Sequence, residues 1–134
     1  MLSISQIKRA PKKNYMNAEQ LAFYKGLLLE QKEQAETHLR DAKANLSKHV
    51  RQNDDLDRAQ IEEENRLMLR IVERETILIK KIGAALRRIE DGTYGYCEQS
   101  GKPIGTDRLL VRPTATLSAE EKIFQEAVER NFSD

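Results

Sequence analysis

Three groups of residues in this sequence could bind a partner or a ligand. The first group is acidic: residues 52–64 hold six carboxylates against one base, Arg58, and the six are Asp54, Asp55, Asp57, Glu62, Glu63 and Glu64. Such a cluster suits a positively charged or metal-containing site on a partner. It equally suits a solvated turn followed by a helix, because carboxylates stabilise the positive N-terminal end of a helix. The spacing alone leaves both interpretations open.

The second group is basic. Residues 77–88 hold Lys80, Lys81, Arg87 and Arg88 and no acid. Arg108, Arg112 and Lys122 follow in the part of the chain expected to fold against the same helix. Converging lysine and arginine side chains suit a ligand that carries phosphate. The alternative is that the bases form the solvated face of a helix.

The third group has the spacing of a metal site without its ligands. Cys97 and Ser100 form a C-x2-S pair, Ser118 and Glu121 an S-x2-E pair, and seventeen residues separate the two pairs. Two C-x2-C pairs at this separation would indicate a zinc ribbon. Because only one position is a thiol, we predict that the chain binds no zinc.

Ser118 and Glu121 match instead a capping box, in which each side chain accepts from the other residue's backbone N–H. Packing must then hold the segment together, and the apolar residues available for it are Tyr94, Tyr96, Ile104, Leu109, Leu110, Leu117, Ile123 and Phe124. The lone Cys97 excludes an internal disulfide and fits a reducing compartment, and no second thiol is present to resolve an oxidised form.

The elements that position these groups are two long helices. Apolar residues recur mostly every three or four positions from Leu21 to Leu46 and again from Ile61 to Ile89, which keeps one face of each helix apolar. We predict a first helix over 18–51, capped at its start by Asn17 with the Gln20 side chain reaching back. We predict a second helix that continues to about residue 90 and is stopped by Asp91-Gly92. Joined by the polar turn, they should form an antiparallel coiled-coil hairpin over 17–91 with an acidic tip near 52–59.

Shorter segments flank the hairpin. Residues 1–16 are basic and aperiodic, and we expect a mobile basic lead that docks as an extended segment. Residues 92–117 are rich in Gly and Pro and predict a small turn-rich globular module, a degenerate zinc ribbon with a short hairpin around Gly101; residues 118–134 predict a last amphipathic helix. The fold class is therefore mostly α.

Composition excludes several classes of function. Charged residues make up 34%, above the roughly 25% of an average domain. The net charge is only +1, so the chain as a whole has no excess of charge that would attract it to nucleic acid or membranes. No apolar run is long enough to span a bilayer or to serve as a signal peptide, which predicts a cytoplasmic protein.

Several motifs resemble the DksA/TraR-type family of bacterial transcription factors that enter the secondary channel of RNA polymerase. They are Asp54-Asp-Leu-Asp57-Arg-Ala59, Leu78-Ile-Lys-Lys81-Ile82, Gly95-Tyr-Cys-Glu98 and Arg112-Pro-Thr-Ala115, and the resemblance covers about residues 17–130. Family members usually carry four zinc cysteines, and this chain keeps only Cys97, so it resembles the zinc-independent paralogues.

The resemblance implies a regulator without enzymatic activity that binds RNA polymerase as a monomer, destabilises open promoter complexes, acts with ppGpp and binds no specific DNA sequence. Asp54, Asp57 and Ala59 match the functional tip positions, and Arg74 matches a polymerase contact. Lys81, Arg112 and Lys122 match the bases that hold ppGpp. A Gre-like transcript cleavage factor and a coiled-coil scaffold unrelated to polymerase are the alternatives.

Overall fold

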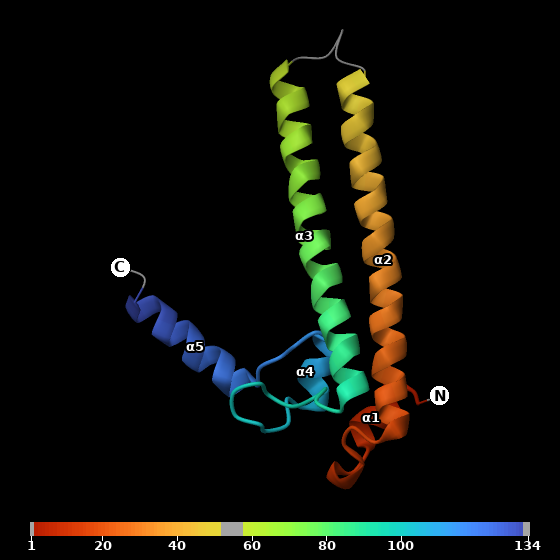
Figure 1. Cartoon of the computed structure of the whole chain (residues 1–134), viewed down its shortest axis with the longest axis vertical. Helices are drawn as coiled ribbons and strands as arrows, with labels where there is room; N and C mark the ends of the chain where they lie inside the picture. Colours follow the sequence, from red (N-terminus) through yellow and green to blue (C-terminus); the bar gives the residue numbers. More distant parts are fainter. Residues whose placement is uncertain (1, 52–57, 133–134) are drawn as a thin grey trace. The chain divides into compact units, whose positions relative to one another are not determined.

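The computed structural model describes residues 2–51 and 58–132. The elements in these residues are helical: α1 (Ile4–Arg9), the 3-10 helix η1 (Lys12–Asn14), α2 (Ala18–Arg51), α3 (Arg58–Asp91), α4 (Thr106–Val111) and α5 (Ala119–Phe132) (Figure 1). The predicted mostly helical fold, with α2 and α3 as a long antiparallel hairpin, is confirmed. The chain divides into two compact units, one formed by Met1–Leu28 with Ala84–Asp134 and the other by Leu29–Gly83. We call these the base unit and the shaft.

Local hydrogen bonds fix the ends of the long helices. At the start of α2, the Asn17 side chain accepts from the Gln20 N–H at 2.9 Å, as expected. The Gln20 side chain reaches one residue further back than predicted, to the Met16 N–H at 3.1 Å, because the Asn17 N–H already donates to the Asn14 carbonyl. At the end of α3, Gly92 adopts a φ of 83°, a conformation that favours glycine, and so reverses the chain.

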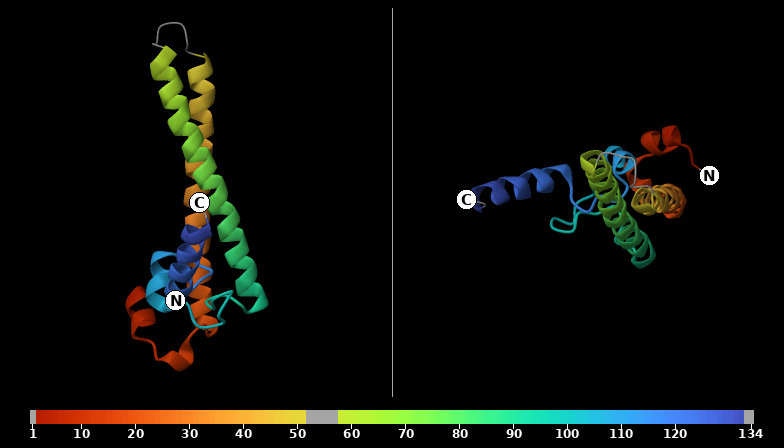
Figure 2. Two further views of the ribbon diagram at one scale, coloured as in Figure 1. Left: turned by 90° about the vertical axis from the view of Figure 1, so that its left-hand side faces the viewer. Right: turned by 90° about the horizontal axis from the view of Figure 1, so that it is seen from above.

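The N-terminal segment is more regular than the sequence suggested. Ser3 and Gln6 form a capping box at the start of α1, and Ile7 is only 1% exposed. α1 packs against α4, and the two lie side by side in Figure 2. The expectation of an extended lead is therefore wrong for Ile4–Arg9, which is helical.

The module at 92–117 has a small core within the base unit. Tyr94, Ile104 and Leu109 are buried as expected, whereas the predicted hairpin around Gly101 is reduced to one antiparallel bridge between Tyr96 and Pro103. Ile123 and Phe124 were expected to complete this core, but they are 65% and 62% exposed, so that expectation is wrong. Leu110 and Leu117 are half-buried and Tyr96 is exposed.

Candidate functional site

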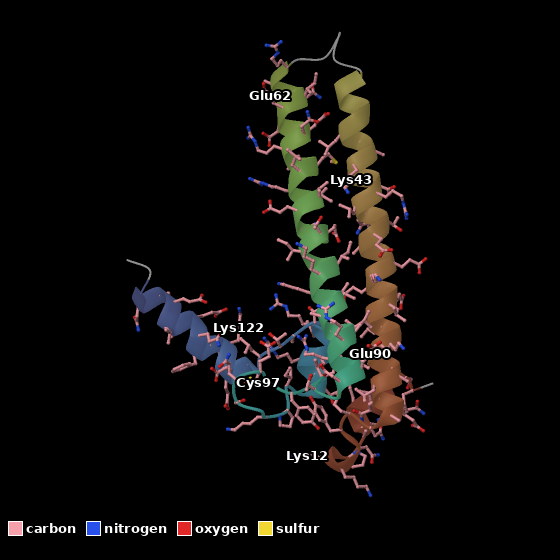
Figure 3. The ribbon with its side chains drawn as sticks, viewed as in Figure 1. Lys12, Lys43, Glu62, Glu90, Cys97 and Lys122 are labelled. Carbon is pink, nitrogen blue, oxygen red and sulfur yellow. The ribbon has the colours of Figure 1, made fainter. Side chains whose placement is uncertain are left out.

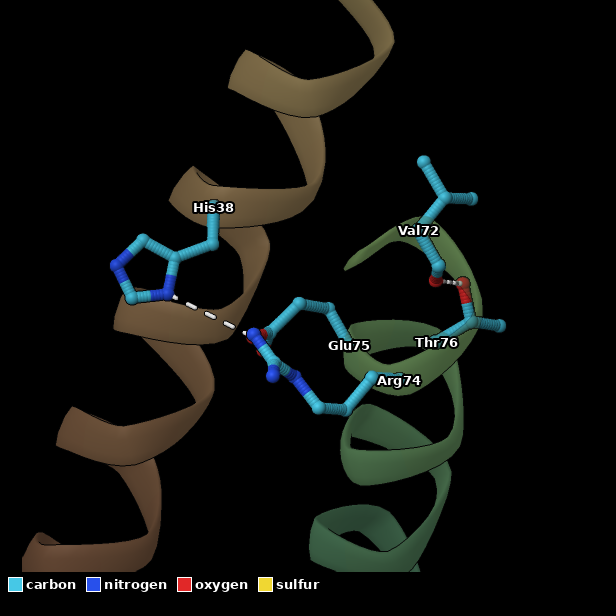
Figure 4. Close-up of polar contacts among 5 residues, drawn as sticks. All are labelled: His38, Val72, Arg74, Glu75 and Thr76. Carbon is cyan, nitrogen blue, oxygen red and sulfur yellow. Dashed lines mark hydrogen bonds and ion pairs between the residues drawn. The ribbon is translucent and has the colours of Figure 1, made fainter. Parts of the chain in front are cut away.

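The shaft carries a charged cluster at the position predicted to contact a partner. Arg74 lies on α3 with 74% of its side chain exposed, and its Nε lies 3.7 Å from Oε1 of Glu75. The Glu75 side chain is only 8% exposed, and the same oxygen lies 3.7 Å from Nδ1 of His38 on α2 (Figure 4). The structure therefore places an exposed arginine beside a buried carboxylate.

Sequence reasoning missed Glu75. The apolar series on α3 steps from Met68 to Ile71 and then to Leu78, and the missing step falls on residue 75. A gap in an otherwise regular series was the available signal, because it indicates that a polar residue occupies a core-facing position.

The three predicted phosphate-binding bases belong to different units. Lys81 is exposed on the α3 part of the shaft, whereas Arg112 and Lys122 lie in the base unit. Arg112 ends α4 and is exposed, and Lys122 of α5 lies 3.9 Å from Glu126 (Figure 3). Within the residues that the structure describes, Lys81 and Arg112 make no ion pair, so both charges are available to a ligand.

Asp54 and Asp57 lie outside the described residues. Ala59 lies in the first turn of α3 and is exposed.

The degenerate metal positions form a hydrogen-bonded cluster instead. Cys97 is 3% exposed (Figure 3). Burial raises the pKa of its thiol, but hydrogen bonds from the Ser100 hydroxyl and from the backbone N–H groups of Ser100, Ser118 and Gln99 outweigh burial and lower the pKa to about 6. The Ser118 hydroxyl accepts from the Glu121 N–H at 3.2 Å, which confirms one half of the predicted capping box.

A contact between the N-terminal segment and the module was also missed. The Tyr15 hydroxyl donates to the Gly95 carbonyl at 2.6 Å and accepts from the Gly105 N–H at 3.0 Å. Met16 covers Gly95 so closely that a Cβ there would lie 2.7 Å from the Met16 Sδ. We call these contacts the N-terminal clasp. They join residues about 80 to 90 positions apart, and no local pattern predicts such pairs.

Known proteins share this combination of helical hairpin and small module. Residues 20–89 match the N-terminal domain of DnaK suppressor protein DksA, which covers more than half of the chain. The chain belongs to the DksA family. Residues 92–127 match the prokaryotic dksA/traR C4-type zinc finger.

Relatives match along nearly the whole chain. The RNA polymerase-binding transcription factor DksA of Caulobacter vibrioides is 46% identical over 121 residues, covering 90% of this chain and 85% of that protein. The protein of the same name from Escherichia coli K12 is 36% identical over 137 residues, covering 97% and 87%. The solved structure of transcription factor DksA2 from Pseudomonas aeruginosa matches with a TM-score of 0.87 and 39% identity, covering 95% of this chain and 98% of that one. These relatives are named as transcription factors, not as enzymes.

The match to a C4-type zinc finger raises the question of whether this DksA-family chain can hold zinc. A C4 site needs four thiolates, and the chain has one cysteine. No group of three or more His, Cys, Asp and Glu side chains within 2–51 and 58–132 is placed to hold a metal ion. The Ser118 hydroxyl is used by the helix cap. The residues present therefore do not fit a C4 zinc site.

Proposed function

We propose that this chain regulates bacterial transcription by binding RNA polymerase through the secondary channel, destabilising open promoter complexes and acting with ppGpp. The observation that carries this proposal is the match along nearly the whole chain to factors named as RNA polymerase-binding. The protein acts as a monomer in the cytoplasm, without enzymatic activity and without sequence-specific DNA binding. No helix in the described parts of the chain is both long and apolar enough to cross a membrane.

The tip supplies the regulatory contact in this proposal. Asp54, Asp57 and Ala59 reach toward the polymerase active site, while the hairpin provides most of the contact area. Asp57→Asn removes one charge at nearly constant volume. We expect this variant to bind polymerase normally and to inhibit a ribosomal promoter less; full inhibition at saturating concentration would contradict the role of the tip.

The bases hold ppGpp only when polymerase completes the site. Lys81, Arg112 and Lys122 offer charge to phosphate, but isolated surface lysines and arginines lose much rotamer entropy when a ligand orders them. Lys81→Ala or Lys122→Ala should reduce the response to ppGpp and leave the ppGpp-independent effect intact. Lys43→Ala, on the exposed side of α2, is a control with the same change in charge. Crosslinking of labelled ppGpp to the free chain as strongly as to the complex would contradict the shared site.

The module folds without zinc. The N-terminal clasp and the core around Tyr94 and Leu109 support this part of the proposal, since they hold together a segment that zinc organises elsewhere in the family.

Two assays separate the alternatives. A pull-down with core RNA polymerase distinguishes a polymerase regulator from a coiled-coil scaffold, which would not be retained. An RNA cleavage assay on stalled complexes distinguishes the proposed regulator from a Gre-like factor, which would shorten the transcript.

A further inference from the structure

Glu75 is a buried carboxylate with no part in the function proposed so far. Its side chain is 8% exposed, whereas Glu73, two residues earlier on α3, is exposed. Burying a carboxylate is unfavourable unless a positive partner compensates the lost hydration. A charged residue at a core-facing position of a helical hairpin therefore requires a specific reason.

Its two partners approach the same oxygen from different helices. Oε1 of Glu75 lies 3.7 Å from Nε of Arg74 on α3 and 3.7 Å from Nδ1 of His38 on α2. Figure 4 shows His38 on one helix and Arg74 and Glu75 on the other. Both distances are too long for hydrogen bonds, and the distance to Arg74, whose guanidinium is always charged, falls in the range of ion pairs. Glu75 therefore acts on Arg74 by electrostatic attraction from a fixed point between the helices.

We propose that Glu75 is a positioning residue that orients Arg74 for its contact with RNA polymerase. This inference rests on the proposed function, in which Arg74 touches polymerase. A free arginine side chain samples many rotamers and loses that freedom on binding, so an anchor that restricts it beforehand strengthens the complex. Burial restricts Glu75 and makes it a better anchor than an exposed glutamate.

The geometry of the contact leaves the binding groups of Arg74 available. A guanidinium donates through Nε and through two Nη groups. Because Glu75 faces Nε, the Nη groups can pair side by side with a carboxylate or a backbone carbonyl of the partner. The side chain remains 74% exposed, which such a contact requires.

A different role for Glu75 would be to fix the register of the hairpin by pairing with His38. Buried polar residues do specify register in some coiled coils. In that case substitution of Glu75 would weaken polymerase binding whatever residue stands at position 74. The two roles therefore predict different results in a double-mutant cycle.

The cycle measures binding of core RNA polymerase by competition against a labelled wild-type chain. The four chains are the wild type, Arg74→Ala, Glu75→Gln and the double variant. We expect Arg74→Ala to weaken binding, and Glu75→Gln alone to weaken it by about three- to tenfold, in the lower part of the range for coupled neighbours. In the Arg74→Ala background, Glu75→Gln should add less than about twofold.

Glu73→Gln is the matched control, since it removes the same charge beside Arg74 from an exposed position. It should change the affinity by less than about twofold. Melting curves followed by circular dichroism check the fold of every variant. If Glu75→Gln does not fold, Glu75→Asp runs the same cycle, because it keeps the charge but shortens the side chain by about 1.5 Å.

Equal weakening by Glu75→Gln in both backgrounds would overturn the inference and favour the register role. The inference would also be overturned if Glu75→Gln bound polymerase as tightly as the wild type while Arg74→Ala bound more weakly. The polymerase contact of Arg74 would then still stand. If Arg74→Ala itself binds like the wild type, the contact assigned to Arg74 fails and the positioning role fails with it.

Discussion

The N-terminal clasp predicts that one hydroxyl group holds the zinc-free module in place. Tyr15→Phe removes the two hydrogen bonds of this hydroxyl, to Gly95 at 2.6 Å and from Gly105 at 3.0 Å. The ring remains, and with it the edge-to-face contact to Tyr96 at a centroid distance of 5.6 Å. The substitution therefore isolates the hydrogen bonds from the aromatic packing.

The expected loss of stability depends on which hydrogen bonds the two partners of the Tyr15 hydroxyl keep in Tyr15→Phe. The Gly95 carbonyl still accepts from the Ile104 N–H at 2.8 Å, whereas the Gly105 N–H loses its acceptor. Two hydrogen bonds at a net 0.5–1.5 kcal/mol each give a decrease of about 1–3 kcal/mol in the free energy of unfolding. For a unit of this size each kcal/mol lowers the melting temperature by about 4–8 °C.

The chain offers a convenient assay. All four tyrosines lie in the base unit and the sequence has no tryptophan, so near-ultraviolet circular dichroism reports unfolding of that unit. Tyr96→Phe is the matched control, because the Tyr96 hydroxyl makes no hydrogen bond within the residues that the structure describes. An unchanged melting temperature for Tyr15→Phe, or an equal decrease for Tyr96→Phe, would refute the role of the clasp.

Four further predictions concern the base unit. Burial raises the pKa of Tyr24 to about 12, so the stabilising contribution of its protonated hydroxyl is complete below pH 10 and is lost as the pH rises toward 12. Alkaline denaturation that begins well below pH 10 would contradict this. The pKa of Cys97, lowered to about 6, predicts a thiolate absorbance at 240 nm that titrates with a midpoint near pH 6 and is absent in Cys97→Ser; a midpoint above pH 8 would refute it. The thiolate also stabilises the fold, and this contribution is present above the ordinary thiol pKa and lost as the pH falls through about 6. Gly95→Ala should destabilise more than Gly101→Ala, since both have a positive φ but only a Cβ at Gly95 meets Met16, and equal melting temperatures would count against this packing. Elemental analysis should find no stoichiometric zinc, and EDTA should leave the melting curve unchanged, whereas a lower melting temperature on chelation would contradict a zinc-free fold.

The sequence predicted the long elements because their signals are local. Apolar periodicity and the cap at Asn17 located α2, and Asp91-Gly92 located the end of α3. α4 was missed because it has only six residues and its N-cap residue, Gly105, has no side chain that could cap the helix. α1 is equally short, but its capping box at Ser3 and Gln6 was readable in the sequence.

The tertiary contacts could not be read in the same way. An amphipathic pattern shows that a helix has an apolar face but not what covers it, which is why Ile123 and Phe124 were wrongly assigned to the core. The clasp at Tyr15 and the cluster at Glu75 depend on residues distant in sequence or on another helix. The gap in the apolar series indicates that Glu75 faces the core, but which residues pair with it follows only from the packed structure.

The most direct test of the proposed function is transcription in vitro from a ribosomal RNA promoter with purified RNA polymerase. The chain, added without zinc, should lower the amount of transcript, and ppGpp should lower it further. Transcript levels that the chain leaves unchanged, both with and without ppGpp, would contradict the account.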